Sequence, residues 1–187
     1  MIATAVSECA TTQPIHKVLY LRDGTSVLVR PIRGDDQDLE RRFIENLGAQ
    51  TRRFRFLGEV NAPSPQFLAA LTHPDAQRDA ALIALIAEGA VKREIGVARF
   101  AGANTAKECE CAVVVADEYQ GRGLATLLMQ ELIEVARQRG MVNMYSIDSR
   151  SNTGMAELAS HLGFARAADP DDASQVVYSL DLRAANV

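Results

Sequence analysis

Six consecutive residues, Gln120-Gly121-Arg122-Gly123-Leu124-Ala125, lie between an apolar run and a long amphipathic segment. The run 112–116 before them is typical of a buried strand, and the segment after them has apolar residues every three to four positions. Where a glycine-rich turn leads from a strand into a helix, several backbone N–H groups have no partner within the helix and can bind an anion. This stretch therefore predicts a phosphate-binding loop.

Two common phosphate-binding motifs do not fit this loop. A dinucleotide-binding fold needs three glycines spaced Gly-x-Gly-x-x-Gly near its first strand, whereas here Thr126 occupies the third position, two-thirds of the way along the chain. The loop of nucleoside triphosphatases ends in Lys followed by Ser or Thr, and this loop contains no Lys. The identity of the phosphate ligand therefore depends on the residues around the loop.

The composition is that of one ordinary globular domain, with 187 residues, 48% of them hydrophobic and 24% charged. A formal net charge of -4 argues against nucleic acid or a membrane surface as a partner, because both attract an excess of Lys and Arg. No apolar run approaches the roughly 20 residues that cross a bilayer, and no secretory signal precedes the domain, which favours a cytoplasmic protein. Cys9, Cys109 and Cys111, without paired histidines, predict neither a disulfide framework nor a metal site.

Hydrophobic periodicity predicts one α/β domain over residues 17–187, preceded by a flexible tail of residues 1–16. Two short apolar runs flank Asp23-Gly24 and predict a hairpin, because this dipeptide tolerates the positive φ of tight turns. The expected fold is a mixed sheet of about seven strands, mostly antiparallel with a central parallel pair, flanked by about four helices.

The central parallel pair comes from the region around the loop. The run 108–115, the amphipathic stretch 121–139 and the run 141–148 predict a strand, a helix and a second strand joined by a right-handed crossover. The stretch 51–56 is both basic and aromatic, and is interpreted as the wall of a substrate cleft or a partly packed loop.

The loop matches the pattern Gln/Arg-x-x-Gly-x-Gly/Ala, follows Val113-x-Val115, and precedes Leu162-Gly163-Phe164 further along the chain. With these residues the chain resembles the GCN5-related N-acetyltransferase (GNAT) family, whose first motif is such a strand, loop and helix. The N-terminal half resembles the acetyltransferase domain of bacterial Pat-type protein lysine acetyltransferases. The stretches that carry this second resemblance are 21–25, 29–32 and Arg55-Phe56.

The resemblance implies acetyl-CoA as co-substrate and no metal. The backbone N–H groups of the loop would hold the pyrophosphate at the positive end of the helix dipole, and the pantetheine arm would pair with the strand before it. The side chain of Arg122 would contact a phosphate or stay in solvent, and Asn152 would bind the cofactor or cap its own helix. The predicted cofactor-binding residues are Val113, Val115, Gln120, Gly121, Arg122, Gly123, Leu124, Ala125 and Asn152.

The resemblance also implies the chemistry. Glu110 stands where Pat-type enzymes carry a glutamate general base, and Glu108 or a water relay are the alternatives. Ala159 replaces the Tyr that protonates the leaving thiolate in many relatives. A primary amine, expected to be that of protein lysine or else of a small molecule, would attack directly in a ternary complex. The missing Tyr leaves open a non-catalytic acyl-CoA sensor, and the chain is expected to be a monomer or homodimer.

Overall fold

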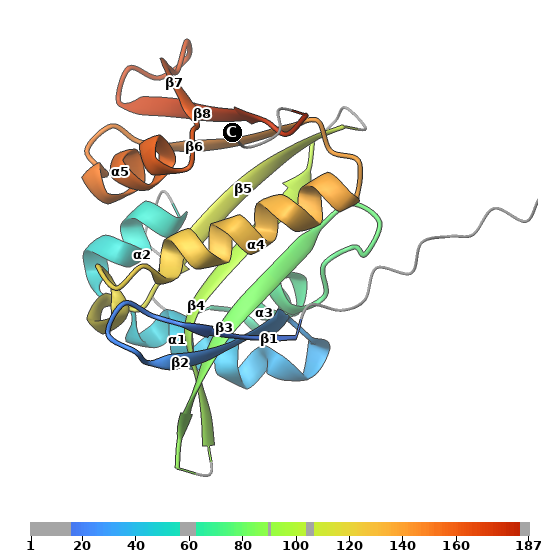
Figure 1. Ribbon diagram of the computed structural model, residues 1–187, viewed down its shortest axis with the longest axis vertical. Coiled ribbons are helices and arrows are strands. Elements are labelled where there is room, and N and C mark those ends of the chain that lie inside the picture. The colour runs from blue at the N-terminus through green and yellow to red at the C-terminus, as the bar shows by residue number, and fades with distance from the viewer. Residues whose placement is uncertain (1–15, 57–62, 90, 104–106, 184–187) are drawn as a thin grey trace, which may run out of the picture.

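The computed structural model describes residues 16–56, 63–89, 91–103 and 107–183 (Figure 1). The predicted flexible tail falls on residues 1–16, of which all but the last lie outside the described residues. All strands of the described residues belong to one sheet.

Within the described residues, eight strands form one sheet in the order β1-β2-β3-β4-β5-β6-β8-β7. Every neighbouring pair is antiparallel except β5 and β6, which are parallel, as expected for a strand-helix-strand crossover. The mixed sheet is therefore confirmed, with eight strands instead of about seven. The strands are β1 (Lys17–Tyr20), β2 (Ser26–Pro31), β3 (Ala80–Glu88), β4 (Val91–Gly102), β5 (Glu108–Val115), β6 (Asn143–Ser149), β7 (Ala165–Ala168) and β8 (Gln175–Asp181).

Five α-helices flank the sheet in the described part of the chain. A Cβ on Gly96 of β4 would lie 3.2 Å from a side-chain methyl of Leu128 on α4, whereas Arg99 donates to Glu40 of α1. Because alternate residues of a strand face opposite sides, α4 covers one face of the sheet and α1 the other (Figure 1). The helices are α1 (Gln37–Asn46), α2 (Ala49–Phe56), α3 (Pro65–Thr72), α4 (Leu124–Gln138) and α5 (Thr153–His161).

Helix α2 corrects the interpretation of stretch 51–56 as a loop and raises the number of helices above four. None of its residues is buried, so it has no apolar stripe that periodicity could detect. Its first turn is held from outside, because the carboxylate of Asp117 accepts hydrogen bonds from the Gly48 N–H and the Thr51 hydroxyl, each at 2.7 Å. The helix start therefore depends on a residue more than 60 positions away.

Helix α4 begins at Leu124, three residues later than the sequence predicts. Gly121 and Gly123 have φ angles of 71° and 88°, in the left-handed region that only glycine adopts readily. The glycine-rich stretch thus stays a turn until Gly123, which is the N-cap of the helix.

The parallel pair separates soon after it forms. Strand β5 pairs with β6 only from Glu108 opposite Asn143 to Glu110 opposite Tyr145. Beyond these residues β5 continues along β4, and β6 continues along β8. The two strands therefore diverge in the middle of the sheet.

Ion pairs anchor α1 to its face of the sheet. Arg30 of β2 makes two hydrogen bonds to the carboxylate of Asp36, at 2.6 and 2.7 Å, and both residues are buried. Arg99 of β4 reaches Glu40 of α1 at 2.9 Å. Glu94 lies in the same buried layer, and neither of its carboxylate oxygens has a hydrogen-bond partner among the described residues. Burial, followed by the charge of Glu40, raises the pKa of Glu94 well above its usual value.

This raised pKa predicts a pH dependence of stability. A carboxyl whose pKa is higher in the folded state contributes most below its unfolded pKa, and the contribution is lost as pH rises through the folded pKa. We expect Glu94→Gln, which cannot ionise, to be more stable than wild type at pH 8 by about 1.4 kcal/mol or more, the value of a tenfold difference between the acid constants of the folded and unfolded states. At pH 4, below the ordinary pKa of a glutamate, the two should agree. Urea unfolding at both pH values measures the difference, and Glu45→Gln, on the exposed side of α1, is the matched control. If the free energy of unfolding of Glu94→Gln and of wild type changes equally with pH, the prediction is wrong.

Candidate active site

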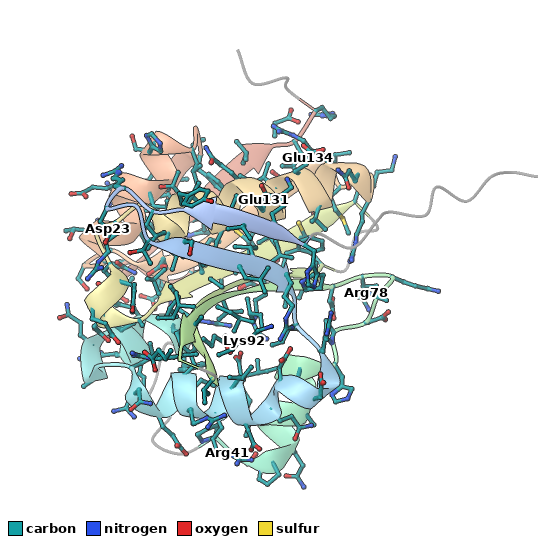
Figure 2. The ribbon with its side chains drawn as sticks, turned by 60° about the horizontal axis from the view of Figure 1, so that its bottom comes forward. Asp23, Arg41, Arg78, Lys92, Glu131 and Glu134 are labelled. Carbon is teal, nitrogen blue, oxygen red and sulfur yellow. The ribbon has the colours of Figure 1, made fainter. Side chains whose placement is uncertain are left out.

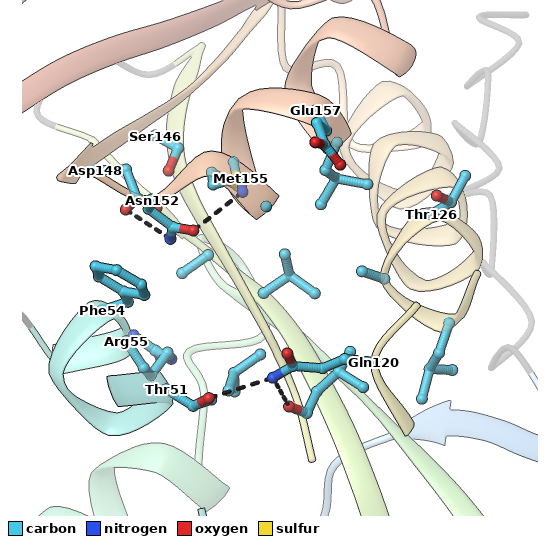
Figure 3. A pocket seen from close by; sticks show the side chains of 18 of the residues that line it. Thr51, Phe54, Arg55, Gln120, Thr126, Ser146, Asp148, Asn152, Met155 and Glu157 are labelled. Carbon is cyan, nitrogen blue, oxygen red and sulfur yellow. Dashed lines mark hydrogen bonds between the residues drawn. The ribbon is translucent and has the colours of Figure 1, made fainter. Parts of the chain in front are cut away.

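A cavity of about 760 Å³ opens where β5 and β6 diverge, between α2 on one side and the start of α5 on the other (Figure 3). All but one of the sequence-predicted site residues line it, although they come from three separate segments. Those lining the cavity are Glu110, Val113, Val115, Gln120, Gly121, Gly123, Leu124, Ala125 and Asn152. Their individual roles remain predictions.

The backbone of β5 has free groups on the cavity side. The N–H of Ala116 donates to the carbonyl of Ile95 on β4 at 2.9 Å, and the pairing with β4 continues in regular alternation back along β5. Because backbone groups of successive strand residues point to opposite neighbours, those of Val113 and Val115 point away from β4, toward the gap beside β6. The N–H and C=O of Val113 and the N–H of Val115 are open there, whereas the Val115 carbonyl accepts a hydrogen bond from the Gln120 side chain. An amide-containing ligand could therefore add to this edge as an extra strand.

The turn after β5 presents an anion site. No intramolecular hydrogen bond is formed by the backbone N–H groups from Gly121 to Ala125 within the described part of the chain. The N–H of Gln120 is different, because it donates to the carbonyl of Asp117. The Gln120 side chain donates to the Val115 carbonyl at 3.1 Å and to the Thr51 hydroxyl at 3.2 Å. Gln120 therefore joins the loop to β5 and α2, and the five N–H groups after it are available for a phosphate.

Arg122 is the predicted site residue that does not line the cavity. Its guanidinium donates to the carboxylate of Asp23 at 2.8 Å and to the carbonyl of Glu118 at 2.7 Å, and lies over the ring of Tyr119. These contacts occupy its side chain on the β1–β2 side of the loop. A phosphate could still approach its backbone N–H.

Arg22 supplies a cation that sequence patterns did not single out. It lies at the turn between β1 and β2, lines the cavity, and its backbone N–H donates to the carbonyl of Arg122 at 3.1 Å. A Cβ on Gly123 would be 3.4 Å from Arg22 Nε, so the side chain lies against the loop. Its guanidinium makes no hydrogen bond or ion pair with any residue that the structure describes. Arg22 lies in the stretch 21–25 that carried the resemblance to Pat-type enzymes, but nothing in the sequence marked it as a ligand group, because the contact joins segments 100 residues apart.

We expect Arg22→Ala to weaken acetyl-CoA binding about 10-fold, the loss typical of one charge-assisted hydrogen bond. Calorimetric titration with acetyl-CoA and with its 3′-dephospho analogue checks this and identifies the phosphate involved. An equal loss with both ligands assigns Arg22 to the pyrophosphate, and a loss only with acetyl-CoA assigns it to the 3′-phosphate. Arg41→Ala is the control, because Arg41 lies on α1, well apart from the β1–β2 turn marked by Asp23 (Figure 2). Unchanged affinity for both ligands would contradict the assignment.

Asn152 caps α5, which was one of its two predicted roles. Its side-chain oxygen accepts from the N–H of Met155 at 3.1 Å, and its amide donates to the carboxylate of Asp148 at 3.0 Å (Figure 3). Asp148 also lines the cavity, and burial raises the pKa of its carboxyl, although the bonds from Asn152 and Ser149 oppose this. One amide hydrogen of Asn152 remains for a ligand.

Glu110 is exposed on the cavity wall, whereas the alternative base Glu108 does not line the cavity. Glu108 lies at the start of β5, where Asn143 approaches it at 3.5 Å. Tyr145 pairs with Glu110 across the parallel ladder, and burial together with the charges of Glu110 and Glu108 raises the pKa of this phenol. Glu110 is thus the glutamate of the pair that a substrate in the cavity can reach.

The other residues singled out by the sequence supply neither an acid nor a metal site. Ala159 is buried in α5, so no side chain replaces the expected Tyr at that position. Cys109 and Cys111 are buried as free thiols, and burial raises the pKa of Cys109 to about 12. Within the described residues, no cluster of His, Cys, Asp or Glu has the geometry of a metal site. None of the described helices is long and apolar enough to span a membrane.

The diverging strands, the glycine loop and the cavity between them are consistent with the acetyl-CoA-binding arrangement that the sequence motifs predict. Residues 51–164 match the model of the Acetyltransferase (GNAT) family. The chain is also 45% identical over 180 residues to Acetyltransferase PA5475 of Pseudomonas aeruginosa, an alignment that covers 96% of this chain and 97% of the relative. The chain therefore belongs to the GNAT family of acetyltransferases, enzymes that use acetyl-CoA.

Solved structures show the same fold. The GNAT domain of S. lividans PAT superposes with a TM-score of 0.81 at 26% identity, covering 89% of this chain and 96% of that domain. The yncA protein of Salmonella typhimurium, solved with its cofactor acetyl-CoA, has a TM-score of 0.65 at 19% identity, with 83% and 94% of the two chains covered. The second likeness concerns the fold alone.

Proposed function

We propose that this protein transfers the acetyl group of acetyl-CoA to a primary amine, with Glu110 as the general base. The observation that carries the proposal is that one cavity brings together the free N–H groups of the loop, the open edge of β5 and the carboxylate of Glu110. The pyrophosphate would bind to the five N–H groups after Gln120, and the pantetheine arm would pair with the backbone of Val113 and Val115.

The chemical step requires the acceptor to lose a proton. A lysine-type amine with a pKa near 10.4 is deprotonated at pH 7 in only about one part in 2,500, a cost of ~4.6 kcal/mol. Glu110 would take this proton directly or through a water while the nitrogen attacks the thioester carbonyl. The C–N bond forms, the C–S bond breaks, and CoA leaves as a thiolate. With Ala159 in place of the usual Tyr, water would protonate the thiolate, which is a good leaving group because its thiol pKa is near 8.5.

Protein lysine is the acceptor that the resemblance to Pat-type enzymes favours, supported by the structural likeness to the GNAT domain of S. lividans PAT. A small amine is the second candidate, favoured by the arrangement of charges around the cavity. A non-catalytic sensor of acyl-CoA, suggested by the missing Tyr, predicts binding without turnover.

The test combines two measurements on the wild-type protein. Calorimetry should show acetyl-CoA binding, and release of CoA should be stimulated by at least one member of a panel of peptides and small amines. Tight binding without turnover on any acceptor would support the sensor instead. Absence of acetyl-CoA binding would refute both.

A further inference from the structure

Arg55 is the arginine of α2 that lines the cavity. Its guanidinium is partly buried and lies 5.1 Å from the ring centre of Phe56. It makes no hydrogen bond or ion pair with any residue in the described part of the chain. Thr51 and Phe54 project from the same helix into the cavity beside it, and Asp148 and Asn152 lie across from them (Figure 3).

The surroundings of Arg55 are costly for a cation. Burial lowers its pKa to about 10, and the positive charge of Arg99 acts in the same direction. Glu40, which would oppose this, already pairs with Arg99 at 2.9 Å. Because an arginine remains charged even at this pKa, the cavity contains a desolvated positive charge that an anion would stabilise.

Glu110 is the other charge that acts on Arg55 from within the cavity wall. The two residues do not form an ion pair with each other, so each is free to bind a group of opposite charge. An ammonium group next to Glu110 and an anionic group on Arg55 would then be held together in one ligand. A guanidinium donates two parallel hydrogen bonds to a carboxylate, the best geometric match for such an anion.

We propose that the acceptor is a small amino acid-like molecule, whose carboxylate binds Arg55 while its amine faces Glu110. The inference rests on the proposed acetyl transfer and specifies its acceptor. The ring of Phe54 provides an apolar surface for the rest of that molecule. A lysine side chain within a protein has no carboxylate beside its amine and would leave Arg55 without a partner.

The test compares acceptors that differ only in the carboxylate. Leucine is paired with 3-methylbutylamine and phenylalanine with 2-phenylethylamine, and kcat/KM is measured for wild type and for Arg55→Gln. For each acceptor, kcat/KM of wild type is divided by kcat/KM of the variant. This ratio removes the effect of the different pKa values of the free amines. We expect Arg55→Gln to lower kcat/KM at least about 10-fold for the amino acids and less than about 2-fold for the amines.

Arg53→Gln is the matched control, because Arg53 is an exposed arginine on the same helix and does not line the cavity. It should leave both acceptor classes unaffected. Arg55→Lys keeps the charge without the planar fork and should retain part of the preference. A further measurement needs no variant: 4-methylpentanoate, which is leucine without its amine, should compete with the acceptor but not with acetyl-CoA.

Equal losses for amino acids and amines, or failure of 4-methylpentanoate to compete, would overturn the inference. So would acetylation of lysine in an N-terminally blocked peptide at a rate that Arg55→Gln does not change. These outcomes leave acetyl transfer itself intact. Absence of acetyl-CoA binding or of turnover on any amine would instead refute the proposed function.

Discussion

Replacing Glu110 by Gln is expected to lower kcat about 100- to 10,000-fold, the range for loss of a general base. Gln has nearly the same shape but cannot accept the proton of the attacking amine. The affinity for acetyl-CoA should not change, because the proposed cofactor contacts are backbone groups of β5 and of the loop. Steady-state kinetics against pH checks this, since the residual rate should rise with pH as more of the amine loses its proton unaided.

Glu108→Gln is the control for this substitution. Glu108 lies on the same face of β5 two residues earlier and does not line the cavity, so its replacement should leave kcat near the wild-type value. If Glu108→Gln reduces kcat and Glu110→Gln does not, the assignment of the base is wrong. If neither does, the amine loses its proton by another route.

Replacing Gly123 by Glu is expected to weaken acetyl-CoA binding at least about 100-fold, because several charge-assisted hydrogen bonds to the pyrophosphate would be lost together. The new carboxylate would lie beside the N–H groups that the pyrophosphate needs and would repel it. It could also pair with Arg22, whose Nε lies 3.4 Å from the position of the added Cβ. Calorimetry or retention on immobilised CoA measures the loss.

This substitution also strains the backbone, because Gly123 has a φ of 88°. Gly140→Glu provides a matched control, since Gly140 has a φ of 74° at the far end of α4 and open space around it. The two variants should lose similar stability, and only the Gly123 variant should lose binding. Wild-type affinity in Gly123→Glu would mean that the loop does not bind the pyrophosphate.

Strong local patterns made the fold predictable from the sequence. The Asp23-Gly24 turn between two apolar runs and the stripe of Leu residues that α4 buries against the sheet are both local patterns, so they were visible in the sequence. Helix α2 was missed because it buries no residue completely and begins where Asp117 holds Gly48 and Thr51. Such a helix has no pattern of its own to recognise.

The candidate site divides in the same way. The loop, the strand before it and Glu110 lie within 16 residues of one another, so one motif contained them. Gln120 fitted that motif, yet its side chain fastens the loop to Val115 and Thr51. Arg122 fitted it too, yet its side chain is held by Asp23. From the motif alone both side chains were candidate ligand groups, because their partners lie in distant parts of the chain.

The sequence by itself determined the family, the mixed sheet with its parallel pair, and the turn in which glycines leave N–H groups free. The family was identified by the resemblance of its motifs. The sheet and the turn depend on elements that follow one another along the chain, so local spacing indicates them. Only the tertiary structure decided that Arg22 lies against the loop and that Arg55 faces the same cavity as Glu110. Both placements join segments 55 to 100 residues apart, and the charge left without a partner there becomes visible only when those segments pack together.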